Sequence, residues 1–172
     1  VVPRKGPEPY AVRFGCVFLK ELGYPRMILQ TDGEPAIKSW AEAVQREWSK
    51  ESKDIQTQLV LRNSPVGSHQ SNGTAESRVK VIEGIVRTMK ASLERTLKSP
   101  IIPTAAIVPW MVRHGAFITS RYASRPTGRT PYEELYMTQY TSPVMMFAES
   151  VLARKIVETK GKFVSSWESG LW

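Results

Sequence analysis

The segment Met27-Ile28-Leu29-Gln30-Thr31-Asp32-Gly33-Glu34-Pro35 determines the fold that we expect for this 172-residue chain. Its apolar start is typical of a short buried strand, and Asp32-Gly33 is typical of the turn that ends one. Pro35 suits the first turn of a helix, because a missing N–H costs no hydrogen bond there. The segment therefore predicts a strand that leads directly into a helix, with an aspartate at the junction.

The residues around this segment continue the alternation of helices and strands. We predict a helix over residues 10–22, ended by Gly23, and another strand at Leu59-Val60-Leu61. The clearest periodicity predicts an amphipathic helix of about six turns, with apolar residues at steps of three and four. These residues are Val79, Ile82, Val86, Met89, Leu93 and Leu97. The alternation indicates an α/β layered fold, in which sites form at the carboxyl ends of strands.

The C-terminal part of the chain has a different pattern. A helix is predicted over residues 109–122 and a short helical turn over residues 130–135. Two later stretches are rich in strand-forming residues, namely 144–147 and 151–153. We therefore predict two domains, an α/β core over residues 1–137 and the start of a small β-rich unit over residues 138–172.

The composition narrows the functional classes. Lys and Arg number 24 against 16 Asp and Glu, which gives a net charge of +8 and a pI near 9.7. This surplus favours a polyanionic partner, although a basic soluble domain without one has the same balance. Cys16 is the only cysteine, which excludes an intrachain disulfide, and with two histidines it cannot form a four-ligand zinc site. No apolar run reaches the roughly 18–20 residues of a membrane span, so no membrane partner is expected.

Two acidic residues are placed where they could share a metal ion. Asp32 follows the predicted strand, and Glu76 lies in the first turn of the long helix. Two such carboxylates that face each other would bind a hard divalent cation, and a third would complete a site for two ions. Simpler roles also fit, because Asp before Gly is common in turns, and a Glu at position N3 behind a Gly73 N-cap favours the helix dipole.

Three segments resemble, in order, the catalytic core of retroviral and retrotransposon integrases. The segment Ile28–Ile37 resembles the strand that carries the family's second catalytic Asp. Ser64–Glu76, with Gln70, Asn72 and Gly73, resembles the loop and helix start that carry its catalytic Glu. Arg125–Leu135, with Thr130-Pro131-Tyr132-Glu133, is similar to the segment that closes the core of copia-type retroelement polyproteins.

The resemblance implies a ribonuclease H-like fold in which Asp32 and Glu76 are the second and third members of an Asp, Asp, Glu triad. Such a triad binds two Mg²⁺ or Mn²⁺ ions and joins DNA 3′ ends to target DNA, the reaction of DNA integration. The loop residues that would contact DNA are His69, Gln70 and Asn72. Lys80 and Arg87 are candidate phosphate contacts, with solvated pairs to Glu76 and Glu83 as the alternative.

The chain departs from this family at its start. No Asp precedes Asp32, and Glu8 and Glu21 are poor substitutes because one lies between prolines and the other near a helix end. The core is therefore expected to lack its first strands, as a piece of a longer polypeptide, and to have little or no strand-transfer activity by itself. The alternative is a non-catalytic nucleic-acid-binding or assembly remnant of a decayed or domesticated retroelement. The resemblance further implies homo-multimers, action in the nucleus and presence in cytoplasmic retroelement particles.

Isolated aromatic and titratable residues receive structural interpretations. Trp40, Trp48 and Trp110 are predicted to anchor the core rather than to stack on bases. His114 is predicted to be structural, and Cys16, on an apolar helical stripe, to be a buried thiol.

Overall fold

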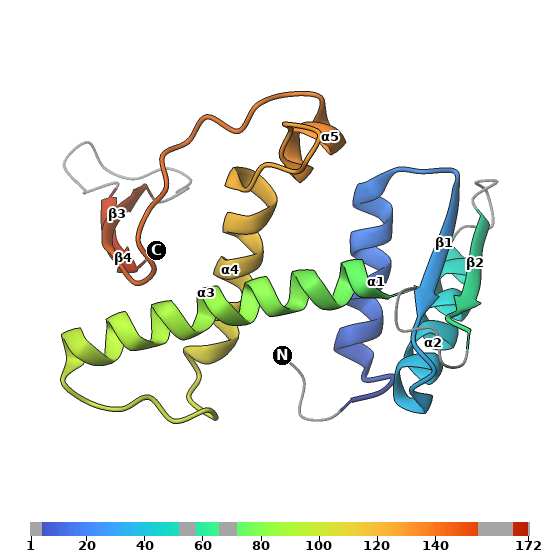
Figure 1. Ribbon diagram of the computed structural model, residues 1–172, viewed down its shortest axis with the longest axis horizontal. Coiled ribbons are helices and arrows are strands. Elements are labelled where there is room, and N and C mark those ends of the chain that lie inside the picture. The colour runs from blue at the N-terminus through green and yellow to red at the C-terminus, as the bar shows by residue number, and fades with distance from the viewer. Residues whose placement is uncertain (1–4, 52–57, 66–71, 155–166, 172) are drawn as a thin grey trace, which may run out of the picture. The chain divides into compact units, whose positions relative to one another are not determined.

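The computed structural model describes residues 5–51, 58–65, 72–154 and 167–171. Over these ranges the chain is mixed α/β, with five helices, a two-stranded parallel sheet and a two-stranded antiparallel sheet (Figure 1). The chain divides into two compact units, Val1–Val79 and Lys80–Trp172. No helix within the described ranges is long and apolar enough to cross a membrane. The α/β class is thereby confirmed, whereas the domain boundary at residue 137 stays a prediction.

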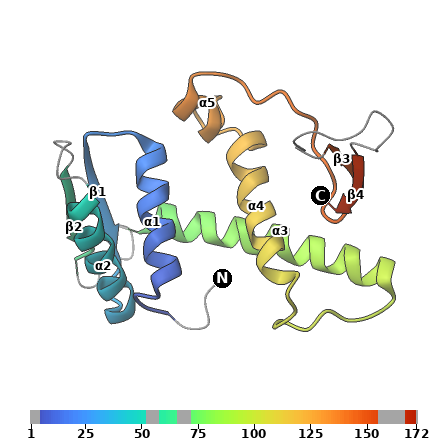
Figure 2. The same cartoon turned by 180° about the vertical axis from the view of Figure 1, so that it is seen from behind.

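The first unit is a strand–helix–strand arrangement preceded by one helix. Its elements are α1 (Pro9–Leu22), β1 (Arg26–Thr31), α2 (Pro35–Glu51), β2 (Gln58–Asn63) and the start of α3 (Gly73–Leu97). β1 and β2 are parallel, with Arg26 opposite Gln58 and Thr31 opposite Asn63. Parallel strands need a crossover, which α2 provides. The front and back views show α2 across one face of the strand pair, beside α1 (Figures 1 and 2).

The core of the first unit lies between α1, α2 and the inner face of this strand pair. Its buried members are Val12, Cys16, Leu19, Ala43, Val44, Trp48 and Leu59, with Met27, Leu29 and Trp40 packed against them. The predicted core roles of Trp40 and Trp48 and the predicted burial of Cys16 are therefore confirmed. On the outer face, Ile28 remains 59% exposed and its neighbour Val60 43% exposed. One face of the sheet thus carries the core, and the other is open to solvent.

Gly15 of α1 packs tightly against side chains of α2. A Cβ at this position would lie 3.0 Å from Trp40 Cζ2 and 3.1 Å from Val44 Cγ2. We expect Gly15→Ala to lower the free energy of unfolding by about 1–3 kcal/mol, because the core must shift to admit the methyl group. Urea unfolding measures the change. Gly84→Ala is the matched control: its Cβ would meet only the end of Arg87 at 4.0 Å, so a gain of about 0.5–1 kcal/mol is expected. Equal losses at both glycines would contradict the packing explanation.

The second unit contains the rest of α3, two further helices and a hairpin of short strands. These elements are α4 (Val108–Tyr122), α5 (Pro131–Tyr136), β3 (Ser150–Arg154) and β4 (Trp167–Leu171). The buried side of α4 is formed by Met111, Gly115 and Thr119. A Cβ on Gly115 would lie 3.5 Å from Ile82 Cγ2 on α3. The two helices therefore meet at Gly115, where a Cβ would make only ordinary van der Waals contact with α3.

The segment Arg125–Leu135 leads into α5 and forms most of this helix. Thr130 Oγ1 accepts a hydrogen bond from the Glu133 amide at 3.1 Å, and Glu133 Oε2 accepts one from the Thr130 amide at 2.6 Å. This capping box lowers the pKa of Glu133, chiefly through the Thr130 backbone N–H. Arg125 Nη1 also pairs with Glu134 Oε2 at 2.5 Å. The predicted helical turn is confirmed, and its polar residues have local structural roles.

Two predictions about the second unit are wrong. Residues 144–147 form no strand, because Glu149 turns back and donates its amide to the Met146 carbonyl at 3.0 Å. The predicted amphipathic helix is confirmed as α3, although none of its residues is buried and Val79 and Leu97 are more than half exposed. Trp110 is 58% exposed and anchors no core. In α4 the core position is taken instead by its neighbour Met111, which is fully buried.

Candidate metal and nucleic-acid site

Asp32 follows the last residue of β1 and is exposed to solvent. Thr31, one residue earlier, is buried, and its side chain donates to Asn63 Oδ1 on β2 at 3.3 Å. Asp32 Oδ1 accepts the Glu34 amide at 3.1 Å, so the predicted turn role is present. No described residue donates a hydrogen bond to its other oxygen. The carboxylate therefore stabilises the turn into α2 with one oxygen and presents the other to solvent.

Asn72 connects the start of α3 to the carboxyl ends of both strands. Its Oδ1 accepts hydrogen bonds from Ser64 Oγ at 3.0 Å and from Gln30 Nε2 at 3.4 Å. Gln30 lies on β1, two residues before Asp32, and Ser64 directly follows β2. Gln30 Nε2 also lies 3.3 Å from Ser64 Oγ. One amide oxygen thus links the end of β1, the end of β2 and the start of α3.

The N-cap of α3 differs from the predicted one, and this difference shifts the helical position assigned to Glu76. The Asn72 carbonyl accepts the first helical hydrogen bond, from the Glu76 amide at 3.0 Å. Asn72 is therefore the N-cap and Gly73 the first helical residue. The interpretation of Glu76 as an N3 residue behind a Gly73 cap is wrong by one position. Glu76 is exposed, and its carboxylate makes no hydrogen bond or ion pair with a described residue.

These contacts bring the segments of Asp32 and Glu76 to the same end of the parallel strand pair. Carboxylate oxygens at the carboxyl end of a strand and the first turn of a helix suit a hard divalent cation. The described residues contain no group of three Asp, Glu, His or Cys that could hold a metal. Glu34, which is close in sequence, is engaged by Lys5 Nζ at 2.9 Å from each carboxylate oxygen. The described part of the chain therefore places two exposed carboxylates, Asp32 and Glu76, on segments that meet at this end of the strand pair.

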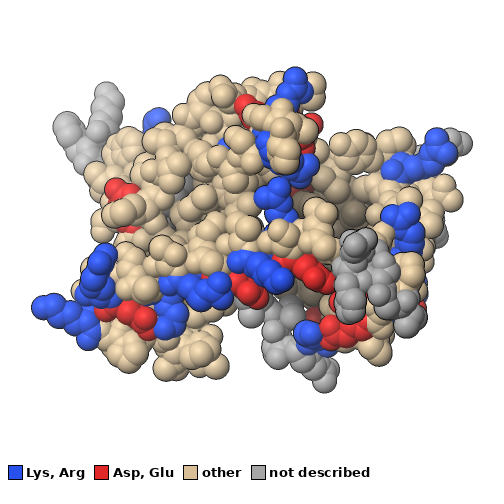
Figure 3. All heavy atoms as spheres, viewed as in Figure 1, with Lys and Arg blue, Asp and Glu red and all other residues tan. Residues whose placement is uncertain are grey.

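The other residues predicted to contact DNA have different outcomes. His69 and Gln70 lie outside the described residues. Lys80 and Arg87 are exposed on α3, where Lys and Arg side chains alternate with acidic ones (Figure 3). The alternative prediction was that Lys80 and Arg87 form ion pairs with Glu76 and Glu83. Within the described ranges, neither side chain forms such a pair. Both cations therefore remain open to an anionic partner.

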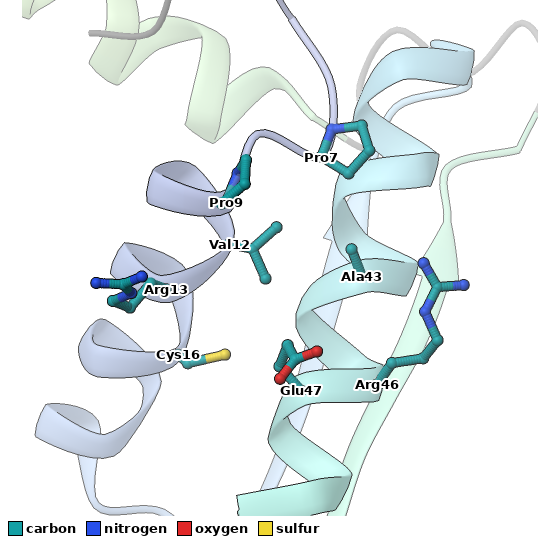
Figure 4. A pocket seen from close by; sticks show the side chains of 8 residues that line it. All are labelled: Pro7, Pro9, Val12, Arg13, Cys16, Ala43, Arg46 and Glu47. Atoms are coloured by element: carbon teal, nitrogen blue, oxygen red, sulfur yellow. The ribbon is translucent and has the colours of Figure 1, made fainter.

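A separate cavity of about 370 Å³ lies between α1 and α2 in the first unit (Figure 4). Its walls carry Arg13 and Arg46 together with Glu47, and Cys16 lies at its base. The Cys16 thiol is buried and lies 3.8 Å from the Val44 carbonyl. Neither Asp32 nor Glu76 lines this cavity. The two carboxylates therefore lie outside this cavity.

Gln30 and Ser64 are the residues of this site that sequence reasoning missed. Gln30 is a polar residue that directly follows the apolar run Met27–Leu29 of β1, and Ser64 precedes Pro65 at the end of the other strand. The polar residue in the strand was the available signal, but its partner is 42 residues away. Comparisons of the chain with models of protein families, with curated proteins and with solved structures found no match.

Proposed function

We propose that this chain is part of an integrase-type polynucleotidyl transferase in which Asp32 and Glu76 are ligands of a divalent cation. The observation that carries the proposal is the bonding of Asn72 to Gln30 and Ser64, which places the start of the Glu76 helix at the end of the Asp32 strand. The order of the three integrase-like segments supports it further. A ribonuclease H-like core is the fold that this proposal requires.

The donor set fits a hard cation such as Mg²⁺ or Mn²⁺, because both ligands are exposed carboxylates. Such a cation would activate a water or a DNA 3′ hydroxyl and stabilise the leaving oxygen. The chain's own residues supply and orient the oxygens. The Glu34 amide fixes one oxygen of Asp32, and Asn72 fixes the first turn of the Glu76 helix. A full two-metal site needs one more carboxylate than the described residues bring together.

The charge of the chain supports DNA as the partner. The second unit holds 13 Lys and Arg against 7 Asp and Glu, so it contains +6 of the net +8. Lys80 and Arg87 are exposed members of this set. Cations of this kind bind phosphates regardless of sequence and release condensed counterions. The same proposal includes self-association of the chain on DNA ends. It also includes action in the nucleus and presence in cytoplasmic retroelement particles.

The second candidate function is a non-catalytic nucleic-acid-binding or assembly module. It is favoured by the absence, within the described ranges, of a third acidic residue beside Asp32 and Glu76. Both candidates bind DNA electrostatically, so salt dependence does not separate them. They differ in whether Asp32 and Glu76 act together on one metal ion.

A Mn²⁺ titration followed by NMR tests this difference. The paramagnetic ion broadens amide signals near it, so one shared site will broaden residues 31–34 and 73–77 at the same Mn²⁺ concentration. We expect either Asp32→Asn or Glu76→Gln to lower the Mn²⁺ affinity by about 10–100-fold. Broadening of both segments would then need a correspondingly higher Mn²⁺ concentration. Asp32→Asn is well matched, because the asparagine oxygen can still accept the Glu34 amide.

Glu83→Gln is the control for this titration, because it removes another exposed carboxylate of α3. It is expected to leave the broadening of both segments unchanged. Two segments that respond at different concentrations, or that each respond only to their own substitution, would indicate two unrelated carboxylates. That result would favour the non-catalytic module.

A further inference from the structure

The second unit contains a largely apolar pocket of about 550 Å³ beside α4. Six of its lining residues are Ile107, Trp110, Arg113, Phe117, Phe147 and Leu171. Its volume is within the range of sites that hold small ligands or large side chains. Arg113 is the one permanently charged residue in its lining. The pocket thus combines aromatic surface with a single cation.

Trp110 and Arg113 form the exposed side of this pocket. They are three residues apart on α4, so they share a helix face. The Arg113 guanidinium carbon lies 5.0 Å from the centre of the Trp110 ring, over its face. Trp110 nevertheless remains 58% exposed. A large indole is therefore held in place by a cation on one side while most of it stays open to solvent.

An exposed indole beside a guanidinium matches the two parts of a nucleotide. A base stacks on an aromatic ring, and such stacking tolerates every base because each has a π face. The guanidinium pairs with the phosphate, often through two parallel hydrogen bonds. The surplus of +6 in the second unit also favours a polyanion over a neutral ligand.

We propose that this pocket binds an unpaired base of a single-stranded polynucleotide, with Trp110 as the stacking surface and Arg113 as the phosphate contact. An apolar side chain from a protein partner would also fill the pocket, but it would leave Arg113 without an anion. Duplex DNA keeps its bases stacked inside the helix and offers no free base to Trp110. The inference rests on the proposed function only in taking nucleic acid as the partner, and it requires neither Asp32 nor Glu76.

Fluorescence anisotropy with a labelled oligo-dT of about 16 nucleotides tests the pocket. A blunt duplex of the same length is measured beside it, at one salt concentration and with EDTA present. We expect Trp110→Leu to weaken binding of the single strand by roughly 5- to 150-fold and to leave duplex binding unchanged. Trp110→Phe, which keeps an aromatic face, is expected to retain most of the affinity. Arg113→Gln is expected to weaken single-strand binding as well.

Trp167→Leu is the matched control, because it removes another tryptophan that is about as exposed, at 55%, and does not line the pocket. It should bind the single strand like the unchanged chain. If Trp110→Leu fails to fold by circular dichroism, Trp110→Phe and Arg113→Gln decide the question. The inference would be overturned if the Trp110 and Arg113 substitutions affected single-strand and duplex binding equally, or affected neither. It would also be overturned if the substituted chains lost self-association in sedimentation experiments but kept their oligonucleotide binding. Failure of the Mn²⁺ titration alone would remove the proposed function and leave this inference standing.

Discussion

Replacing Trp48 by alanine is expected to lower the free energy of unfolding of the first unit by about 3–5 kcal/mol. Trp48 is only 5% exposed, and it belongs to the cluster formed by α1, α2 and β2. Its Nε1 makes no hydrogen bond with a described residue, so packing alone accounts for its contribution. Because this core is small, neighbouring side chains can only partly fill the space that the indole leaves.

Urea unfolding, monitored by circular dichroism, measures this loss. Trp48→Phe retains an aromatic ring and removes the unpaired N–H, so its loss should be the smaller one. Trp167→Ala, at a largely exposed tryptophan, is expected to change stability by no more than about 0.5 kcal/mol. Losses of similar size at Trp48 and Trp167 would mean that the first unit has no core centred on Trp48.

The second large effect concerns catalysis. These 172 residues are expected to join no DNA ends with Mg²⁺, because the described residues contain no group of three Asp, Glu, His or Cys that could hold the metal ions. A polypeptide that places a third carboxylate beside Asp32 is expected to gain the reaction. Within the described ranges, one edge of β1 pairs with β2 and the other has no strand partner, so it is where an additional strand would pair. In such a polypeptide, Asp32→Asn or Glu76→Gln should lower joining by about 100-fold or more, since even residues that only orient metal ligands change activity 10–100-fold.

A strand-transfer assay with a labelled DNA end measures this effect. Glu83→Gln, on the same helix as Glu76, is expected to leave the rate unchanged. Magnesium-dependent joining by the 172 residues alone, abolished by Asp32→Asn, would show that two carboxylates suffice or that a third lies in a segment outside the described ranges. Retained joining in the Glu76→Gln variant of the longer polypeptide would remove Glu76 from the catalytic role.

Local pattern predicted most of the secondary structure of this chain. Periodicity and punctuation by Pro and Gly located α1, α2, α3 and α4, because these signals act over one or two turns. Gly23, with a φ of 68°, ends α1 where it was expected to. The strands β1 and β2 were found as short apolar runs. For these elements local propensity and tertiary packing favour the same conformation.

Predictions failed where burial depends on distant parts of the chain. Trp110 and Met111 are adjacent on α4, and hydrophobicity alone favours the larger residue as the buried one. The face of α4 that carries Met111 and Gly115 is instead the buried one, and Gly115 on it faces Ile82 of α3. The run of residues 144–147 is apolar enough for a strand, but the turn at Glu149 prevents one. A sequence pattern indicates which residues are apolar enough to be buried. It does not indicate which of these residues the folded chain buries.

The candidate site shows the same division. Asp32 and Glu76 were identified from short motifs, each readable within a few residues. The bonds of Asn72 to Gln30 and Ser64 join positions 42 and 8 residues away, and no local signal encodes the first of them. Hydrogen bonding between segments is decided by the register of β1 against β2, which the sequence alone does not specify.

The bond from Ser64 Oγ to Asn72 Oδ1 has a consequence for protein engineering. It holds the two ends of the segment between these residues at a fixed spacing. The entropic cost of closing a longer loop grows only slowly with length, by about 0.6 kcal/mol for each doubling. Sequences of other lengths and compositions can therefore be grafted between Ser64 and Asn72 while Glu76 keeps its place. The position is suited to a library in which this segment is varied while Asp32 and Glu76 are left unchanged.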